Sequence, residues 1–466
     1  MTDSVIWSVV RKESRQALRN GRLILGGGLL LLLGLASCLL GWMDYRSEVE
    51  TAREGNREAR EHWLAQEAKN PHTAAHYGVY IFKEPQPGTL FDPGVNAYSG
   101  GSVFVEAHYK NDAAFQPIRE RTTLARFGNL NPAFFLIFLV PLVVIMLSYG
   151  SICGEKENGS LYAVATTGVS PRSWLVGKWL AACILPALAL FGCLILSLIL
   201  SGGQVKPIQW LVLSVGYLLY LGSVVNITLL VSTKSKTTTT ALLVLCGWWI
   251  LGSLAGPRIA SNVAENVYPT PVGQNFHLAM KDEKKVGVGD HIDGVKKGAL
   301  AQYGVEDTKD LPINFNAMSL QADEEFADVI NDRHYAELYA NQRKQNNIYR
   351  AFAVIWPAMP VRLQSMALAG SDLAAHHQFN KEAEAYRRHF VKFLNDDMML
   401  NSKTGDWGYQ AEAGLWAEVP EFAPATRPTS SVIRDAVPDL TLLALWFGVS
   451  GILLVASSKN LFRRAV

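Results

Sequence analysis

Six long apolar stretches, uncharged except for Asp439 at the edge of the last, constrain the fold of this chain more than any other feature. They occupy residues 23–43, 133–153, 179–203, 208–232, 237–257 and 439–458. At about 1.5 Å of rise per residue, roughly 20 helical residues cross the hydrocarbon core of a bilayer. Buried helices of soluble proteins are rarely both this long and this free of charge, so the sequence predicts six transmembrane helices.

The placement of positive charge predicts how these spans are oriented. The net charge of +2 is uninformative, but basic residues cluster before span one, between spans two and three, between spans four and five, and after span six. The short loop between spans three and four has only Lys206. By the positive-inside rule both termini are cytoplasmic, and the insertions 44–132 and 258–438 lie outside. The basic residues are Arg11, Lys12, Arg15, Arg19, Arg22, Lys156, Arg172, Lys178, Lys234, Lys236, Lys459, Arg463 and Arg464.

The N-terminal segment 1–22 predicts a further membrane element. Ile6, Trp7 and Val10 recur at helical spacing, while Arg11 and Arg15 occupy another face. A basic amphipathic helix with a tryptophan is typical of a helix that lies flat at the cytoplasmic interface. The alternative is a simple positively charged flank of the first span.

The residues of the spans and of the loop 154–178 argue against several energy sources for transport within this chain. The central portions of the spans hold no Asp, Glu, Lys, Arg or His, which argues against a proton relay or an ion-coupled transporter. Gly154 and Gly159 have the glycine spacing of a phosphate loop, but Ser160 and Leu161 replace its Gly-Lys-Ser/Thr ending. No catalytic triad or carboxylate pair is evident. We therefore expect a non-catalytic chain without a cofactor of its own, powered by another subunit.

The loop 154–178 carries the most specific motif. Its residues resemble the first cytoplasmic loop of ABC-2 type transporter permeases, in which a short coupling helix docks onto an ATP-binding subunit. Leu161, Tyr162 and Val164 would form an apolar knob there, with a helix start at Pro171 after a Ser170 cap. The alternative is an ordinary polar connector, for which this loop is long. The predicted coupling residues are Glu155, Lys156, Glu157, Asn158, Gly159, Ser160, Leu161, Pro171 and Arg172.

The resemblance covers nearly the whole chain. Large insertions after spans one and five are similar to those of ABC-2 permeases with a DUF3526-type periplasmic domain. Matching stretches in the first insertion are 70–78, 90–94 and 126–128, and those in the second include Gly370, Ser371, Asp372, Phe379, Tyr386, Arg387 and Asn395. The departures are Ser160 and Ser371, where threonine is frequent in the family.

The resemblance implies the partners and the location of the chain. They are a cytoplasmic ABC ATPase dimer carrying ATP and Mg²⁺, a second identical or sister permease, and membrane lipid in the bacterial inner membrane. A periplasmic partner is compatible with the resemblance, and no nucleic acid is expected.

The insertions predict an α+β domain outside the membrane. Residues 44–69 have helical periodicity and continue span one, whereas 77–109 favour short strands and turns. Segments 323–347 and 371–395 predict amphipathic helices, the second capped by Ser371 or Asp372. A break is expected at 356–360 and a proline-rich linker at 413–428. The two insertions are expected to pack together.

The histidines favour no metal site at this stage. All ten lie in the insertions. His72 and His76 are four residues apart, a spacing that lets two imidazoles on a helix share an ion. Because no cysteine partner or dense acidic cluster accompanies them in the sequence, we predict no metal site. Asp372 and Arg387 are candidates for an ion pair, and helix capping and surface solvation are favoured over a catalytic role for them.

Three classes of function remain open. The leading hypothesis is the permease subunit of an ATP-driven exporter. The second is a mechanotransmission subunit, whose spans pass force to the insertions without moving a substrate. The third is a membrane receptor or scaffold, which would not need the long loop at 154–178.

Overall fold

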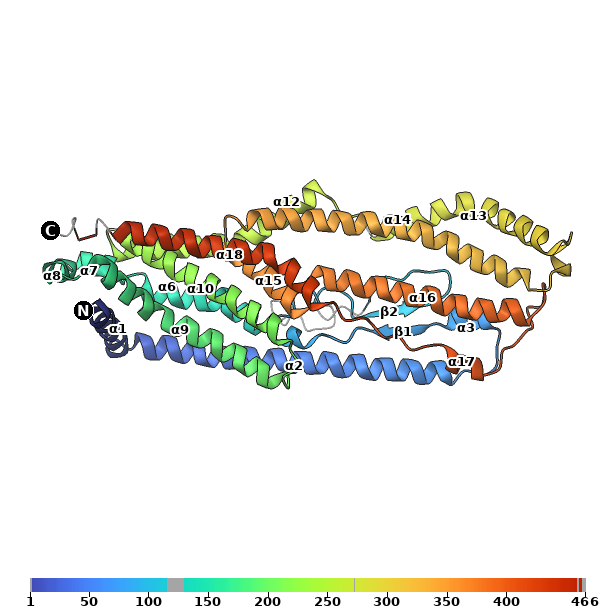
Figure 1. The fold of residues 1–466 in the computed structure, drawn as a ribbon, viewed down its shortest axis with the longest axis horizontal. Coiled ribbons are helices and arrows are strands. Elements are labelled where there is room, and N and C mark those ends of the chain that lie inside the picture. Colours follow the sequence, from blue (N-terminus) through green and yellow to red (C-terminus); the bar gives the residue numbers. More distant parts are fainter. Residues whose placement is uncertain (1, 115–129, 272, 459–460, 463–466) are drawn as a thin grey trace.

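The chain is elongated and mainly helical in a computed structural model that describes residues 2–114, 130–271, 273–458 and 461–462 (Figure 1). The stretch 126–128 and the basic residues Lys459, Arg463 and Arg464 lie outside the described residues. Helices α1 (Thr2–Arg19), α7 (Cys153–Glu157) and α8 (Ser160–Thr166) gather at one end of the molecule, together with the C-terminal end of α18 (Thr429–Ser458) (Figure 1). This end is called the terminal end below.

Six helical segments among the described residues are long and apolar enough to cross a membrane, and each overlaps one predicted span. They are Arg22–Leu64, Pro132–Glu157, Pro171–Leu200, Pro207–Lys234, Thr238–Val267 and Thr429–Ser458. The elements that form them, besides α7 and α18, are α2 (Arg22–Leu64), α5 (Pro132–Phe134), η3 (Phe135–Leu139), α6 (Val140–Ser148), α9 (Pro171–Leu200), α10 (Pro207–Lys234), α11 (Thr238–Ile250), η4 (Leu251–Ala255) and α12 (Gly256–Val267). The prediction of six candidate spans is confirmed.

Helix α10 is the centre of the bundle. In its most apolar stretch 61% of the residues are buried within the protein, the largest share among the six segments. Asn226 of α10 accepts a hydrogen bond from Trp179 Nε1 of α9 at 2.7 Å and donates to the carbonyl of Phe447 in α18 at 3.2 Å. Polar groups at membrane depth must find partners within the protein. Asn226 therefore ties three spans together.

The two insertions form a second body, called here the insertion domain. Its helices run beside the outer half of α2, which continues well beyond the bundle (Figure 1). An antiparallel pair, β1 (Val79–Phe82) and β2 (Ser102–Val105), is in register from Val79 opposite Val105 to Phe82 opposite Ser102. The remaining elements are α3 (Pro71–Tyr77), η1 (Pro87–Leu90), α13 (Gly273–Tyr303), η5 (Thr308–Asp310), α14 (Phe315–Phe352), α15 (Ala358–Ala369), α16 (Leu373–Asn401) and α17 (Gly414–Glu418).

Aromatic packing joins the two insertions, as expected. The Trp63 ring of α2 lies 4.9 Å from that of Phe390 in α16, and Trp63 Nε1 donates to the carbonyl of Trp416 in α17 at 2.9 Å. All three side chains are almost fully buried. Large aromatic side chains contribute much of the apolar area in such a core.

Two boundaries differ from the predictions. The break expected at 356–360 ends at Pro357, and Ala358 begins α15, so Met359 and Pro360 are helical. Proline is compatible with the first helical turn because its missing N–H has no partner there. The linker predicted at 413–428 contains the short helix α17, because Trp416 is buried against Trp63.

Candidate functional site

The loop 154–178 folds into two short helices at the terminal end. Helix α7 ends at Glu157 with Asn158 as its cap, and Gly159 follows with φ of 75°, in the left-handed region that favours glycine. The Asn158 side chain accepts from the Ser160 N–H at 2.9 Å, and α8 runs to Thr166. The Ser170 hydroxyl then accepts from the Ser173 N–H and caps α9, with Pro171 at its first position. The capping prediction is confirmed.

Side chains of α7 hold the junction between the fourth and fifth spans. Lys156 Nζ donates to the carbonyls of Thr233 and Ser235, the latter at 3.3 Å, where α10 ends. Glu157 Oε2 accepts from the Thr238 N–H at 3.0 Å, where α11 begins. A displacement of α7 would therefore act directly on two spans.

A buried ion cluster joins α7 to α1 and α9. Lys178 Nζ lies 2.9 Å from both Glu155 Oε1 and Glu13 Oε1, and it donates to the Ser151 carbonyl at 2.7 Å. Lys12 Nζ approaches Glu155 Oε1 to 2.5 Å. The Lys178 side chain is 1% exposed and that of Glu155 is 11% exposed. Glu155 therefore forms its ion pairs within the protein.

The exposed part of the loop 154–178 is smaller than the predicted docking motif. Tyr162 is 54% exposed and Arg172 is exposed, but Leu161 is only 2% exposed. The predicted knob of Leu161, Tyr162 and Val164 is wrong in this respect, since Leu161 faces the protein core and Val164 is half-buried. The surface available to a partner is centred on Tyr162.

The sequence matches the family model described as ABC-2 family transporter protein over residues 7–331, well over half of the chain. The chain belongs to the ABC-2 transporter family. A second model, the domain of unknown function DUF3526, matches residues 289–425 and covers most of the second insertion of this ABC-2 protein.

A curated relative agrees with the family of this ABC-2 protein. The probable ABC transporter permease protein NosY of Stutzerimonas stutzeri is 33% identical over 78 residues. The match covers 16% of this chain and 28% of the relative, so the chain spans little more than a quarter of that protein. Together with the six apolar helices, the family makes this chain a multi-pass membrane subunit of the ABC transporter type.

The predicted insertion residues of this ABC-2 protein meet where the two insertions join above the spans. Gly370 ends α15 with φ of 74°, and Asp372 caps α16 by accepting from the Ala375 N–H at 2.9 Å. Ser371 Oγ donates to the Asp92 carbonyl at 2.7 Å, and a Cβ atom at Gly94 would lie 2.4 Å from the Ser371 oxygens. The stretches 90–94 and 370–372 therefore form one contact.

The other predicted residues of the DUF3526 region lie on α16 and have structural partners. Phe379 is buried in the aromatic core, and the Tyr386 hydroxyl donates to the Pro420 carbonyl at 3.0 Å. The ion pair considered between Asp372 and Arg387 is not formed, because Arg387 contacts carboxylates of α14 and α16 while Asp372 pairs with Arg427 at 3.2 Å. Asn395 contacts His72.

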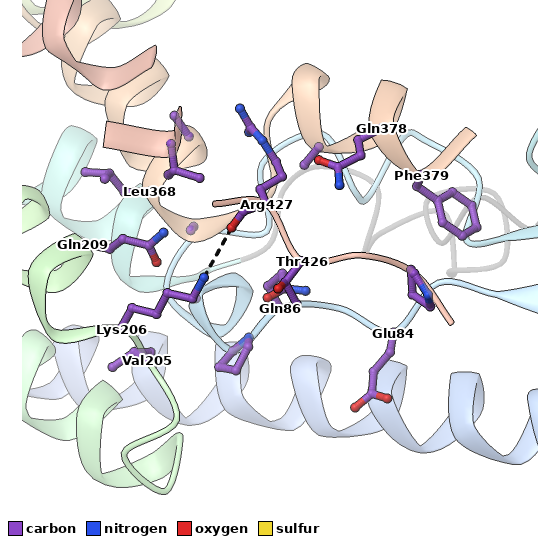
Figure 2. Close-up of a pocket in the computed structure, with 18 of the residues that line it drawn as sticks. Glu84, Gln86, Val205, Lys206, Gln209, Leu368, Gln378, Phe379, Thr426 and Arg427 are labelled. Carbon is purple, nitrogen blue, oxygen red and sulfur yellow. Dashed lines mark hydrogen bonds between the residues drawn. The ribbon is translucent and has the colours of Figure 1, made fainter. Parts of the chain in front are cut away.

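A cavity of about 140 Å³ lies between the insertion domain and the spans of this ABC-2 protein. Figure 2 shows Lys206 and Gln209 from the start of α10, Arg427 from the linker, and Gln378 and Phe379 from α16 around it. Lys206 Nζ donates to the Arg427 carbonyl at 3.4 Å, marked by the dashed line (Figure 2).

Sequence reasoning missed one cluster of histidines. His72 and His76 lie one turn apart on α3, and His108 joins them from the segment after β2, so that their ligand atoms lie within 4.8 Å of one another. The acidic partners that the sequence did not show come from α14, because Asp323 and Glu324 both contact His108. The separation of 216 residues between His108 and Glu324 hides this contact from any local pattern.

Two further histidines, His376 and His377 on α16, predict a pH dependence of stability. Burial, together with the charges of Lys83 and His377, lowers the pKa of His376 to about 4 against the opposing charge of Asp112. Burial likewise lowers the pKa of His377 to about 4. An imidazole with a pKa depressed on folding binds its proton better in the unfolded chain, so the stability it contributes above pH 6.5 is lost as the pH falls toward 4.

We expect His376→Gln to reduce this loss. Since one pKa unit corresponds to about 1.4 kcal/mol, the wild-type protein should lose on the order of 2 kcal/mol more than the variant between pH 6.5 and pH 4.5. Thermal unfolding of the purified protein at several pH values measures the difference. His389→Gln, at an exposed position on the same helix, is the matched control, and an unchanged pH slope in His376→Gln would contradict the prediction.

Proposed function

We propose that this chain is the membrane subunit of an ATP-driven ABC-2 exporter of the bacterial inner membrane, with both termini in the cytoplasm. A dimer of cytoplasmic ATPases, carrying ATP and Mg²⁺, docks at the terminal end, and two permease chains pair in the bilayer. Substrate leaves between the spans toward the cavity below the insertion domain. The family supports this assignment, and the basic residues of the terminal end support the orientation.

The proposal rests on one observation, the set of side-chain contacts that hold α7, the helix next to α8. Tyr162 projects from a short helix whose neighbour α7 is bonded through side chains to α1, α9, α10 and α11. Force applied at Tyr162 is thereby shared among several spans. An ordinary polar connector would not need this number of buried charged contacts, which are costly to form.

We expect Tyr162→Arg to lower the amount of ATPase that co-purifies with the permease by at least about tenfold, since an exposed aromatic side chain at the centre of an interface can contribute 2 kcal/mol or more. Co-purification in detergent with the ATPase expressed beside it provides the measurement. Tyr98→Arg is the matched control, because Tyr98 is 60% exposed in the insertion domain. Equal recovery with both variants would contradict the docking proposal.

Force transmission to the insertion domain is the second candidate. The continuous 43-residue helix α2 favours it, since it runs from the terminal end along the bundle and the insertion domain (Figure 1). A spin label at exposed Val286 of α13 would then move by several ångströms relative to the spans on ATP binding. A proline at exposed Glu54, which breaks the helix, would abolish this movement without loss of ATPase binding. No movement in the wild type would exclude this mechanism.

A further inference from the structure

Three imidazole rings converge where α3 meets the segment that follows β2. The ring centroids of His72, His76 and His108 lie 4.8, 5.0 and 5.1 Å apart, and their closest ligand atoms fall within 4.8 Å. Nitrogen ligands of a tetrahedral zinc ion stand about 3.3 Å apart, given Zn–N bonds of about 2.0–2.1 Å. Small ring rotations therefore suffice to bring all three onto one ion.

Side chains of the second insertion contact two of these rings at their Nδ1 atoms. His72 Nδ1 lies 3.2 Å from Asn395 Oδ1. His108 Nδ1 lies 2.9 Å from Glu324 Oε1 and 3.4 Å from Asp323 Oδ2, although its N–H is not aligned for a hydrogen bond. Histidines that bind metals usually present one nitrogen to the ion and the other to a carboxylate or carbonyl oxygen. This arrangement leaves Nε2 of both rings for a shared ligand.

The backbone places His108 at a conformational cost. Its φ of 67° makes it the one non-glycine residue with positive φ in the described chain. Its N–H donates to Glu324 Oε1, which fixes the unusual conformation. Side chains held in sparsely populated backbone regions are concentrated at functional sites.

The charges around the cluster suit a cation site. The carboxylates of Asp323 and Glu324 both face His108, with oxygens 3.4 and 2.9 Å from its Nδ1. Two carboxylates beside a cluster of imidazoles favour a positive charge there, and a bound metal ion would supply it.

We propose that His72, His76 and His108 bind a divalent transition-metal ion of the zinc class. Imidazole ligands suit Zn²⁺, Ni²⁺ and Cu²⁺ and exclude a calcium or magnesium site. His76 is exposed and provides the entry path, and three protein ligands leave one position open to water. All three ligands belong to the first insertion, whereas their supports belong to α14 and α16 of the second. The ion therefore fastens the two insertions together.

The test uses the full-length protein in detergent, purified with a histidine-free tag and stripped with a chelator. We expect one Zn²⁺ per chain by calorimetry and elemental analysis, with a dissociation constant in the micromolar range or below and a Zn²⁺-dependent rise in melting temperature. His76→Ala should weaken the affinity by at least about 100-fold, and Asp323→Asn by about tenfold. His62→Ala, at another exposed histidine, should bind as the wild type does.

Two results would overturn the proposal. One is wild-type binding that is substoichiometric or indistinguishable from that of His76→Ala, provided that the stripped proteins melt alike. The other is equal weakening by His62→Ala, which would show nonspecific binding to surface histidines. If His76→Ala melts early, His76→Gln takes its place and the same criteria hold. None of these results depends on ATPase docking at the terminal end.

Discussion

Arg387→Met is expected to lower the free energy of unfolding of the insertion domain by about 3–5 kcal/mol, as when one partner of a buried ion pair is removed. The Arg387 side chain is 4% exposed. Its guanidinium contacts Glu384 and Glu324 at 2.9 Å and also pairs with Asp328. Three carboxylates would thus keep their burial but lose the cation that they share.

The same variant should show a distinct pH dependence. Burial already raises the pKa of Asp328 to about 7 in the wild type, against the opposing charges of Arg387 and Arg388. Without Arg387 the folded chain binds protons that the unfolded chain releases, so the defect should be larger at pH 8 than at pH 5. Thermal unfolding at both pH values measures it.

The neighbouring arginine provides the control for this experiment. Arg388 is 32% exposed and pairs with Asp332 at 2.7 Å, while its contacts with two carboxylates of the Arg387 network are longer, 3.0 Å to Glu384 and 3.2 Å to Asp328. Arg388→Met should lower the unfolding free energy by only about 1 kcal/mol, as is typical of partly exposed pairs. Equal losses for the two variants would show that burial of Arg387 does not set the energetics.

Lys178→Met is expected to destabilise the terminal end by about 3 kcal/mol, the lower limit for breaking a buried pair. It removes the cation between Glu155 and Glu13 and leaves the Ser151 carbonyl without its donor. The loss is not larger because Lys12 still contacts Glu155. We expect a lower melting temperature and, because α1 and α9 separate from α7, reduced ATPase co-purification.

A double-mutant cycle separates the energy of the Lys178–Glu155 ion pair from the effect of replacing Lys178 alone. Glu155→Gln in the Lys178→Met background removes one unpaired charge and should recover at least half of the lost stability. Lys12→Met is the matched control, since the Lys12 side chain is 48% exposed and its loss should cost about 1 kcal/mol. If the double variant is as unstable as the sum of the single variants, the cluster is not a coupled unit.

One of these two networks lies in the helical bundle at the terminal end, and the other lies in the insertion domain. The Lys178 cluster joins the short helices of the terminal end to the bundle, and the Arg387 network holds α14 against α16 in the insertion domain. Between them run α2 and the central helix α10 (Figure 1).

Local sequence patterns predicted the elements of the coupling region but not which of its faces is exposed. The Ser170 cap, Pro171 and the turn at Gly159 follow from backbone chemistry, which depends on near neighbours. The outward knob did not follow, because burial of Leu161 and pairing of Glu155 depend on helices that are distant in sequence. The docking role of these residues stays a prediction.

The sequence by itself determined the six candidate spans, the helical continuation of α2 and a cap at Ser371 or Asp372, of which Asp372 is the one that forms. Each depends on hydrophobic length, periodicity or a hydrogen bond within one turn, all of which are local. Only the tertiary structure decided that His108 joins His72 and His76, that Arg387 pairs with α14 rather than Asp372, and that Lys178 is buried. These contacts join residues far apart in the chain, and their energy comes from desolvated charges and ring geometry that exist only after the helices have packed.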